Sequence, residues 1–360
     1  MTSTLVHSTA PVFKIDGEVK GALARDISTL EIDEATDGLR TMRLRLIAVG
    51  PREGATEEEL LYLDGSDVDF GKEIEVSIGP PDDERIVFKG KISAIEAAFT
   101  AGEDPHVMVF AEDSLMRLRM TRRCKTYENV TDADIASAIA SGNGLTGDVA
   151  ADGPAYKVVQ QWNQSDLAFL RERARLVQAE VWLENDSLCF KTRGNRTGTS
   201  ITLTQGNHLL DVQVRADLAH QRTSVKVSGY DASQRDKVDE EAQGDVVQSE
   251  ISGGRTGPSI LSQALGDRPT YRVRNVPLIG GEAQAWAKAE MLRRARGFVT
   301  VAGTTDGSPD MQVGSKLTLD NIGKPFSGNG YYVTRLRHTY DLDHGHRTHF
   351  EAERATVNDA

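Results

Sequence analysis

The chain has 360 residues, a formal net charge of −12 and a hydrophobic fraction of 39%. This length predicts about two to three domains, and the apolar content is sufficient for a buried core. The acidic balance argues against a general nucleic-acid binder and against binding to an anionic membrane surface. The N-terminal residues lack the features of a secretory signal, and no apolar run approaches the ~18 residues of a membrane span.

The two cysteines, Cys124 and Cys189, form no CxxC pair. In a chain of this length they fit neither a disulfide framework nor a zinc knuckle. We therefore expect reduced thiols in a cytoplasmic product.

The first part of the chain, to about residue 120, is predicted to form strands. Polar and apolar residues alternate at 41–46 and 73–78, and two further runs lie at 85–89 and 106–110. Period-two alternation indicates strands with one buried and one exposed face. Segments rich in glycine, proline and aspartate separate these runs, which is typical of a small sandwich or barrel.

The following segment predicts a mixture of helices and strands. A helix is expected after Thr131, which can cap its N-terminus, and it is expected to end at Gly142. A second helix is expected after Ser165, because apolar residues follow it at helical spacing. A hairpin is expected at residues 180–190. This segment therefore resembles a separate α+β module.

Strands are expected again from about residue 200, with candidates at 201–204, 210–214 and 224–228. Residues 231–256 are polar and mixed in charge, which predicts a linker or a long loop.

A helix is expected at about 282–296, since three arginines suit its C-terminal end and Gly297 can terminate it. A strand at 298–301 follows. The chain is then expected to close with a long hairpin at 331–354 that turns at 343–345.

The expected hairpin carries the densest group of imidazoles and carboxylates, namely His338, Asp341, Asp343, His344, His346 and His349. A tip at residues 343–344 would place His338 opposite His349, and Asp341 opposite His346. These side chains are possible metal ligands, but no fixed ligand spacing such as HExxH is present. We therefore expect a polar hairpin tip, with a metal site as the alternative, and imidazole can make that tip respond to pH.

Other catalytic patterns are absent from the sequence. It has no glycine-rich phosphate loop, no nucleophile elbow and no specific pair of carboxylates. We therefore expect no catalytic residue, no cofactor and no enzyme activity. The one basic stretch, residues 116–123, alternates and predicts a strand with its arginines on one face. It fits an ordinary surface or, alternatively, contact with an acidic neighbour or another subunit.

Four short stretches carry a resemblance to a known family. They are residues 127–135 with 144–145, residues 161–170, residues 225–231 and the closing hairpin from residue 332. Together, and in this order, they resemble the late control protein D family of contractile phage tails and the related first part of VgrG proteins.

This resemblance implies a baseplate hub with a β-rich α+β multidomain fold. Its members form homotrimers, and each protomer carries two tube-like β-barrels, so that three protomers make a pseudo-six-fold ring. The barrels would be residues 1–122 and residues 199–230 together with 314–360. An α+β module would lie between them at 123–198, and residues 231–313 would be an inserted loop and α/β segment.

The family also implies partners. The ring would join the six-fold inner tube protein to a separate three-fold spike protein, with an OB-fold and a β-helix that can carry a PAAR tip, because this chain stops soon after the last hairpin. Other baseplate proteins would bind as well, without stable binding to nucleic acid or membranes. The protein would be cytoplasmic during assembly and then part of a phage tail or an injection particle. The alternatives are a hub of a non-contractile tail and a tail-associated enzyme or carbohydrate-binding protein.

Overall fold

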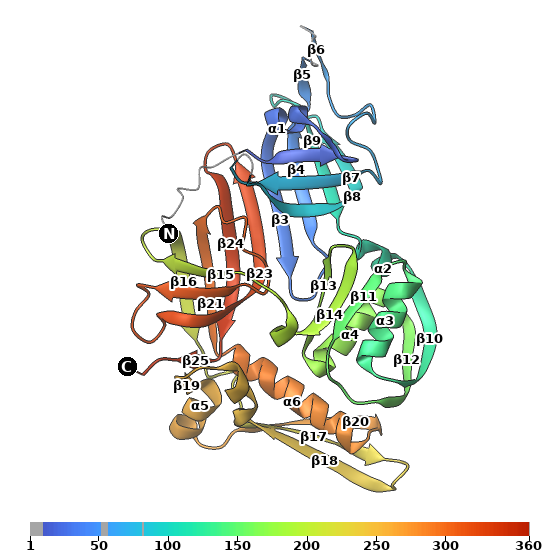
Figure 1. The fold of residues 1–360 in the computed structure, drawn as a ribbon, viewed down its shortest axis with the longest axis vertical. Coiled ribbons are helices and arrows are strands. Elements are labelled where there is room, and N and C mark those ends of the chain that lie inside the picture. The colour runs from blue at the N-terminus through green and yellow to red at the C-terminus, as the bar shows by residue number, and fades with distance from the viewer. Residues whose placement is uncertain (1–9, 52–56, 81–82, 360) are drawn as a thin grey trace.

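The structure is a computed structural model, and it describes residues 10–51, 57–80 and 83–359 (Figure 1). These residues form a β-rich α+β fold with several sheets, as the sequence predicted. None of the helices in the described part of the chain combines the length and the apolar composition that a membrane crossing requires.

The N-terminal part consists mainly of strands. Its elements are β1 (Val12–Ile15), β2 (Glu18–Val19), α1 (Gly21–Asp26), β3 (Ile27–Ala35), β4 (Thr41–Ile47), β5 (Val49–Pro51), β6 (Glu58–Leu60), β7 (Glu73–Ile78), β8 (Arg85–Ala98) and β9 (His106–Glu112). The alternation predicted at residues 41–46 is confirmed, because β4 buries Met42, Leu44 and Leu46. These side chains belong to the first apolar core of the molecule.

The middle part is the expected mixture of helices and strands. Its elements are α2 (Met116–Met120), β10 (Arg122–Val130), α3 (Asp132–Gly142), β11 (Thr146–Ala150), β12 (Tyr156–Ser165), α4 (Asp166–Val177), β13 (Ala179–Glu184), β14 (Ser187–Thr192) and η1 (Arg193–Asn195). Thr131 caps α3 in a capping box with Asp134, and the Ser165 hydroxyl caps α4 by accepting a hydrogen bond from the N–H of Ala168. The predicted hairpin is formed by β13 and β14.

The basic stretch at 116–123 differs from its prediction as a strand. Its first residues form the helix α2, and β10 begins only after it. The carboxylate of Asp113 accepts a hydrogen bond from the N–H of Leu115 at the start of this turn. Helical spacing then buries both Leu115 and Leu118 in the core of the middle part. Burial of these two leucines outweighs the preference that the alternation indicates.

The segment predicted as a linker is also different. β18 (Asp236–Gln243) pairs with β17 (Ser224–Asp231), and β17 pairs on its other side with β20 (Pro269–Pro277). The other elements here are η2 (Gly244–Glu250), β19 (Arg255–Thr256) and α5 (Gly257–Leu265). β18 is an edge strand that buries only Val238 and Ala242, so its composition resembles that of a loop.

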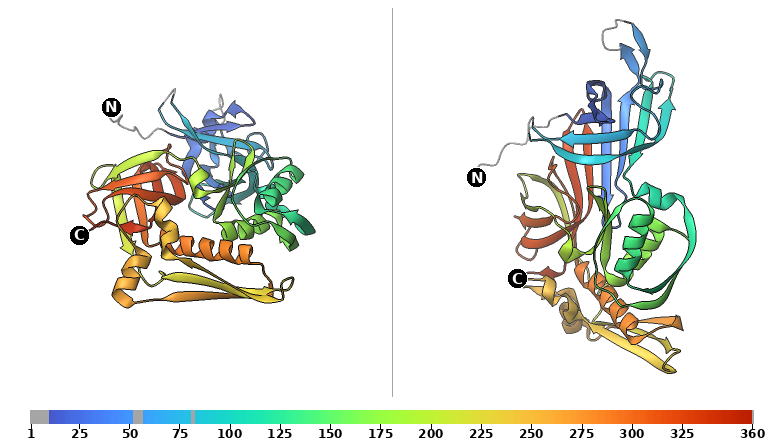
Figure 2. Two further views of the ribbon diagram at one scale, coloured as in Figure 1. Left: turned by 60° about the horizontal axis from the view of Figure 1, so that its bottom comes forward. Right: turned by 45° about the vertical axis from the view of Figure 1, so that its right-hand side comes forward.

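The helix α6 (Gly280–Arg296) covers one face of this three-stranded sheet (Figure 2). It contains the helix predicted at 282–296 and ends, as expected, before Gly297. Val225 and Val227 of β17 pack into the same core as Trp286 and Met291 of the helix. β17 therefore belongs to this sheet and not, as the sequence analysis expected, to the second strand-rich unit.

The C-terminal part returns to strands. Its elements are β15 (Ser200–Thr204), β16 (Leu209–Ala216), β21 (Val299–Asp306), β22 (Lys316–Asp320), β23 (Gly328–Asp341), β24 (Gly345–Arg354) and β25 (Thr356–Val357). β21 was expected in the inserted segment, but it pairs with β16 and with β24. Val299 and Val301 place it in the core of the C-terminal strands, which explains this pairing.

One sheet of 13 strands joins the N-terminal and C-terminal parts, in the order β16-β21-β24-β23-β3-β4-β9-β8-β7-β1-β2, with β22 and β15 branching from β23. The join is the antiparallel pair β3–β23, which runs from Thr29 opposite Asp341 to Ala35 opposite Arg335. On the face that these strands share, the Arg337 Nε lies 3.0 Å from a carboxylate oxygen of Asp33. The two strand-rich parts are therefore continuous in hydrogen bonding.

Candidate functional site

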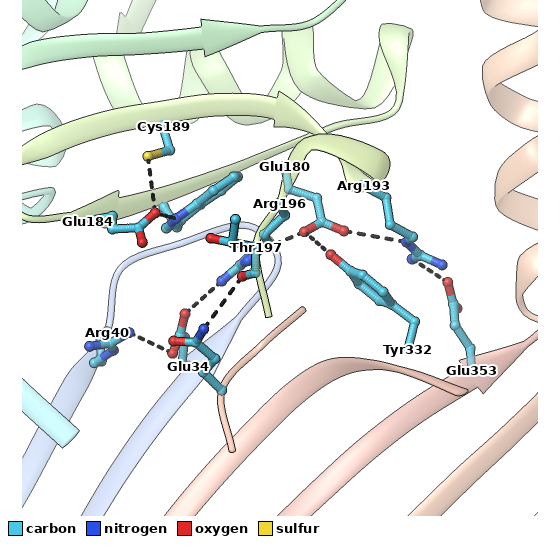
Figure 3. A network of polar contacts seen from close by, with 12 residues as sticks. Glu34, Arg40, Glu180, Glu184, Cys189, Arg193, Arg196, Thr197, Tyr332 and Glu353 are labelled. Atoms are coloured by element: carbon cyan, nitrogen blue, oxygen red, sulfur yellow. Dashed lines mark hydrogen bonds and ion pairs between the residues drawn. The ribbon is translucent and has the colours of Figure 1, made fainter. Parts of the chain in front are cut away.

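A network of buried and partly buried polar side chains lies where the N-terminal, middle and C-terminal parts meet (Figure 3). We call it the junction network, and its members are Glu34, Arg40, Glu180, Arg193, Arg196, Tyr332 and Glu353. β3 and the residues before β4 supply two of them. β13, η1 and the residue after η1 supply three, and β23 and β24 supply the last two.

Arg196 is the centre of the junction network. Its Nη2 donates to Oε1 of Glu34 at 2.8 Å, and its Nη1 donates to Oε2 of Glu180 at 3.1 Å. Its guanidinium also lies over the Trp182 ring, 4.3 Å from the ring centroid. The Arg196 side chain is only 3% exposed, so a single cation links the N-terminal strands to the middle part away from water.

The remaining contacts extend this link to the C-terminal strands. The Tyr332 hydroxyl donates to Oε2 of Glu180 at 2.7 Å, and Arg193 donates to the carboxylate of Glu353. The Arg193 guanidinium stacks over the Tyr332 ring at 4.0 Å. Each carboxylate here has a cationic or hydroxyl donor, which is the condition for burying charge without a large penalty.

The electrostatics keep these groups in their paired states. Burial lowers the pKa of Arg193, but the carboxylates of Glu353 and Glu180 outweigh this effect, so its pKa lies above the ordinary value. Burial and the Glu180 carboxylate raise the pKa of Tyr332, so its hydroxyl keeps the proton that it donates. The arrangement fixes three parts of the chain relative to one another, and its chemistry is that of a structural joint.

The histidines of the closing hairpin lie at three different places. His338 and His346 are both 4% exposed and point toward each other, with Nδ1 of His338 3.1 Å from Nε2 of His346. Thr348 lies beside them, since its hydroxyl is 3.1 Å from the same Nδ1. Burial lowers the pKa of His346 to about 4 and, together with His346, lowers the pKa of His338 well below its ordinary value.

His349 lies on the opposite face of the hairpin, with hydrogen bonds to Thr304 and Thr339. His344 lies in the exposed turn, 3.1 Å from the carboxylate of Asp341. Only His338 and His346 are therefore brought together, and within the described residues no group of three or more metal-ligating side chains forms. The absence of a metal stays a prediction.

The hairpin register predicted from the sequence was wrong by one residue. His338 lies opposite Thr348, and Asp341 lies opposite Gly345. The turn contains three residues instead of two, because Gly345 adopts the left-handed conformation with φ 66° and closes it. The Asp341 carboxylate accepts hydrogen bonds from the N–H groups of Asp343 and His344 and stabilises this longer turn.

Sequence reasoning missed the junction network. Its members are spread from Glu34 to Glu353, so no local spacing connects them. The one available signal was Glu180, a carboxylate that directly precedes the apolar run of β13. Arg196 lies in an irregular segment after η1 and carries no signal of its own.

The family model described as Alg8 N-terminal domain matches residues 18–341. The chain belongs to this family. No curated protein matches the sequence.

Solved structures with the same fold are tail proteins and a secretion component. The 43 kDa tail protein of prophage MuSo2 from Shewanella oneidensis has a TM-score of 0.68 at 14% identity, with 96% of this chain and 98% of that chain covered. The tail protein from Neisseria meningitidis MC58 has a TM-score of 0.66 at 13% identity, with 96% of each chain covered.

The c3393 protein of E. coli, described as a component of the type VI secretion system, has a TM-score of 0.56 at 12% identity. The match covers 94% of this chain and 76% of that one. At these identities the likeness establishes that the chain shares their fold.

Proposed function

We propose that the chain is a structural protein of a phage tail or a phage-derived injection particle, and that it serves as the baseplate hub. The supporting observation is the fold, which the chain shares over 96% of its length with a prophage tail protein that it covers over 98%. A likeness from end to end gives the chain the same arrangement of domains, whereas a likeness limited to one domain would not.

In this proposal three copies form a ring that joins a six-fold tube to a three-fold spike. Two strand-rich parts per chain give six such parts in a trimer, which matches the symmetry of the tube. A ring closed by cyclic symmetry needs a different patch on each side of the protomer. The continuous sheet and the junction network suit this role, because they connect all parts that would transmit force between tube and spike.

We expect no hydrolase activity and no required metal. The junction network and the buried histidines lack a nucleophile that is paired with a base and a third orienting group. The alternative is a tail-associated enzyme or carbohydrate-binding protein. It would be supported if the purified chain digested cell walls or bound glycans.

The test is imaging of the particle that contains this chain. We expect three copies around the particle axis, between the tube and the spike. A single copy, or a ring of six copies, would contradict the proposal. Genes for a sheath protein and a short tube protein beside the gene for this chain separate a contractile particle from a non-contractile tail.

A further inference from the structure

Two segments of opposite charge lie on the surface of the chain, and neither has a role in the junction network. The basic segment is residues 117–125, which contain five lysines or arginines and no carboxylate. The acidic segment is residues 57–69, which contain six carboxylates and no lysine or arginine. We propose that the basic segment of one copy binds the acidic segment of a second copy of this chain. This inference rests on the proposed ring and names its contact surface.

The basic segment is exposed and only partly neutralised. All five of its cations are exposed, at positions 117, 119, 122, 123 and 125. Arg119 pairs with Glu112, and Arg123 pairs with Asp166. Arg122 donates to the backbone carbonyl of Asn163 at 2.7 Å. Within the described residues, the cations at positions 117, 122 and 125 form no ion pair with a carboxylate.

Exposed apolar side chains accompany these cations. Met120 is 68% exposed and Trp162 is 71% exposed. The pairing of Lys125 with Gln161 in β10 and β12, together with the contact between Arg122 and Asn163, brings Trp162 next to the basic segment. A tryptophan beside arginines is the composition that dominates binding energy in protein interfaces.

The acidic segment is also largely exposed, and Lys20 pairs with one of its carboxylates. It comprises β6 and the loop that follows it, and Glu57, Glu58 and Asp69 are exposed. Leu60 is 50% exposed, and Phe70, directly after the segment, is 66% exposed. Each segment therefore combines charge of one sign with apolar surface, and the two signs are opposite.

Within one copy the two segments lie in different regions. β6 is at the upper end of the molecule in Figure 1, whereas α2 and β10 lie on its right flank, beside the middle part. A contact between different patches of two copies is heterologous, and such contacts close into rings when the rotation allows it. Because each copy carries a net charge of −12, it repels the acidic surface of another copy and attracts that copy's basic segment. This difference orients two copies as they approach each other.

Crosslinking of the full chain tests the contact directly, because Cys124 of the basic segment is exposed. Leu60→Cys places a thiol in the acidic segment, and a short bifunctional maleimide then links it to Cys124. We expect species of two and three linked chains, both with the purified chain and in the assembled particle. The control variants are Leu60→Cys with Cys124→Ser, and Leu342→Cys, which lies at the exposed hairpin tip.

Charge reversal supplies a second readout. Arg117→Glu, Arg122→Glu and Lys125→Glu together should weaken self-association at least tenfold, and adding Glu57→Lys, Glu58→Lys and Glu59→Lys should restore it. A matched control with the same change in net charge reverses three exposed cations of the inserted segment, at positions 235, 237 and 268.

The outcomes separate this contact from the proposed function. Three copies in the particle without links between residues 60 and 124, or links only within one chain, would overturn the contact and leave the hub proposal intact. Another symmetry in the particle would overturn the hub, whereas links between copies would still support the contact. Binding of single-stranded DNA that the charge-reversed variant loses, with assembly unchanged, would show that the basic segment has a different ligand and would refute the inference.

Discussion

At the scale of single residues, Arg196 is expected to contribute most to the stability of the junction network. Arg196→Ala removes the cation that Glu34 and Glu180 share, while Glu34 keeps Arg40 and Glu180 keeps Tyr332 as hydrogen-bond donors. Removal of one partner from a buried pair costs about 3–5 kcal/mol when the other charge is left alone, and the remaining donors reduce this cost to about 1–3 kcal/mol. We expect a loss of this size in the free energy of unfolding, measured by urea titration.

The matched control is Arg215→Ala. Arg215 also pairs with a carboxylate, that of Asp217, but its side chain is 74% exposed. Exposed pairs contribute about 0–1 kcal/mol, so this variant should unfold almost like the wild type. Equal losses in the two variants would show that Arg196 does not hold the junction together.

His346 predicts a dependence of stability on pH. The unfolded chain protonates this residue below pH 6.5, whereas burial holds the pKa in the folded chain at about 4. Between these values the unfolded state binds the extra proton, so the free energy of unfolding falls as the pH falls from 6.5 to 4. The shift corresponds to roughly 3 kcal/mol across this window.

His346→Gln removes the titrating group, so the free energy of unfolding should change less steeply with pH. Burial and the neighbouring His346, Arg40 and His349 lower the pKa of His338, so replacing His346 also changes the titration of this imidazole. Asp113, whose pKa burial raises to about 6, acts in the opposite direction because its folded state binds the extra proton. Since Asp113 is common to both proteins, it cancels in the difference between their urea titrations, which reports the coupled pair His338 and His346. Parallel pH profiles would contradict the assignment.

At the scale of elements, the closing hairpin has an exposed tip and a buried base. Leu342 in the turn is 67% exposed, whereas His346 at the start of β24 is 4% exposed. Leu342→Ser should therefore keep the melting temperature within about 1–2 °C, because surface substitutions rarely change stability. If the tip docks on the tube or spike, the same variant should assemble into particles less efficiently.

A substitution at the hairpin tip is a clearer test than a deletion of the tip, because part of the turn is needed for folding. A deletion that includes Gly345 and His346 would remove the left-handed closing residue and a buried imidazole, and loss of folding would then explain any defect. His344→Ser is the control, since that side chain is exposed in the same turn but is polar. Normal particle assembly with Leu342→Ser would show that the tip is only a surface loop.

The elements also show which patterns a single sequence reveals. Caps such as Thr131 and Ser165 marked helix starts correctly, because the hydrogen bonds that they form are local. α2 was misassigned because its burial depends on a core built by distant residues. β18 was missed because an edge strand with one charged face has the composition of a loop. The junction network could not be predicted, because it exists only once three parts of the chain meet.

At the scale of the whole molecule, the decisive feature is the β3–β23 pair, which makes one sheet from strands at opposite ends of the chain. Sequence analysis predicted two separate strand-rich units, because alternation indicates a strand but not its neighbour. Hydrogen bonds across this pair should couple the two parts, so that an opening in one exposes the other to solvent.

Hydrogen exchange of the full chain measures this coupling. Leu44 and Leu188 are both 0% exposed, in the N-terminal core and the middle core respectively. Replacing either with alanine should cost about 2–5 kcal/mol, so the two variants are matched in chemistry and burial.

Leu44→Ala should accelerate amide exchange in β23 as well as in β3, because loosening β4 releases β3 and then its ladder with β23. Leu188→Ala should accelerate exchange in β14 and β13 and leave β23 protected. If amide exchange in β23 responded equally to both variants, the chain would open only as a whole. If exchange in β23 did not respond to Leu44→Ala, the two strand-rich parts would open independently, which would contradict the coupling.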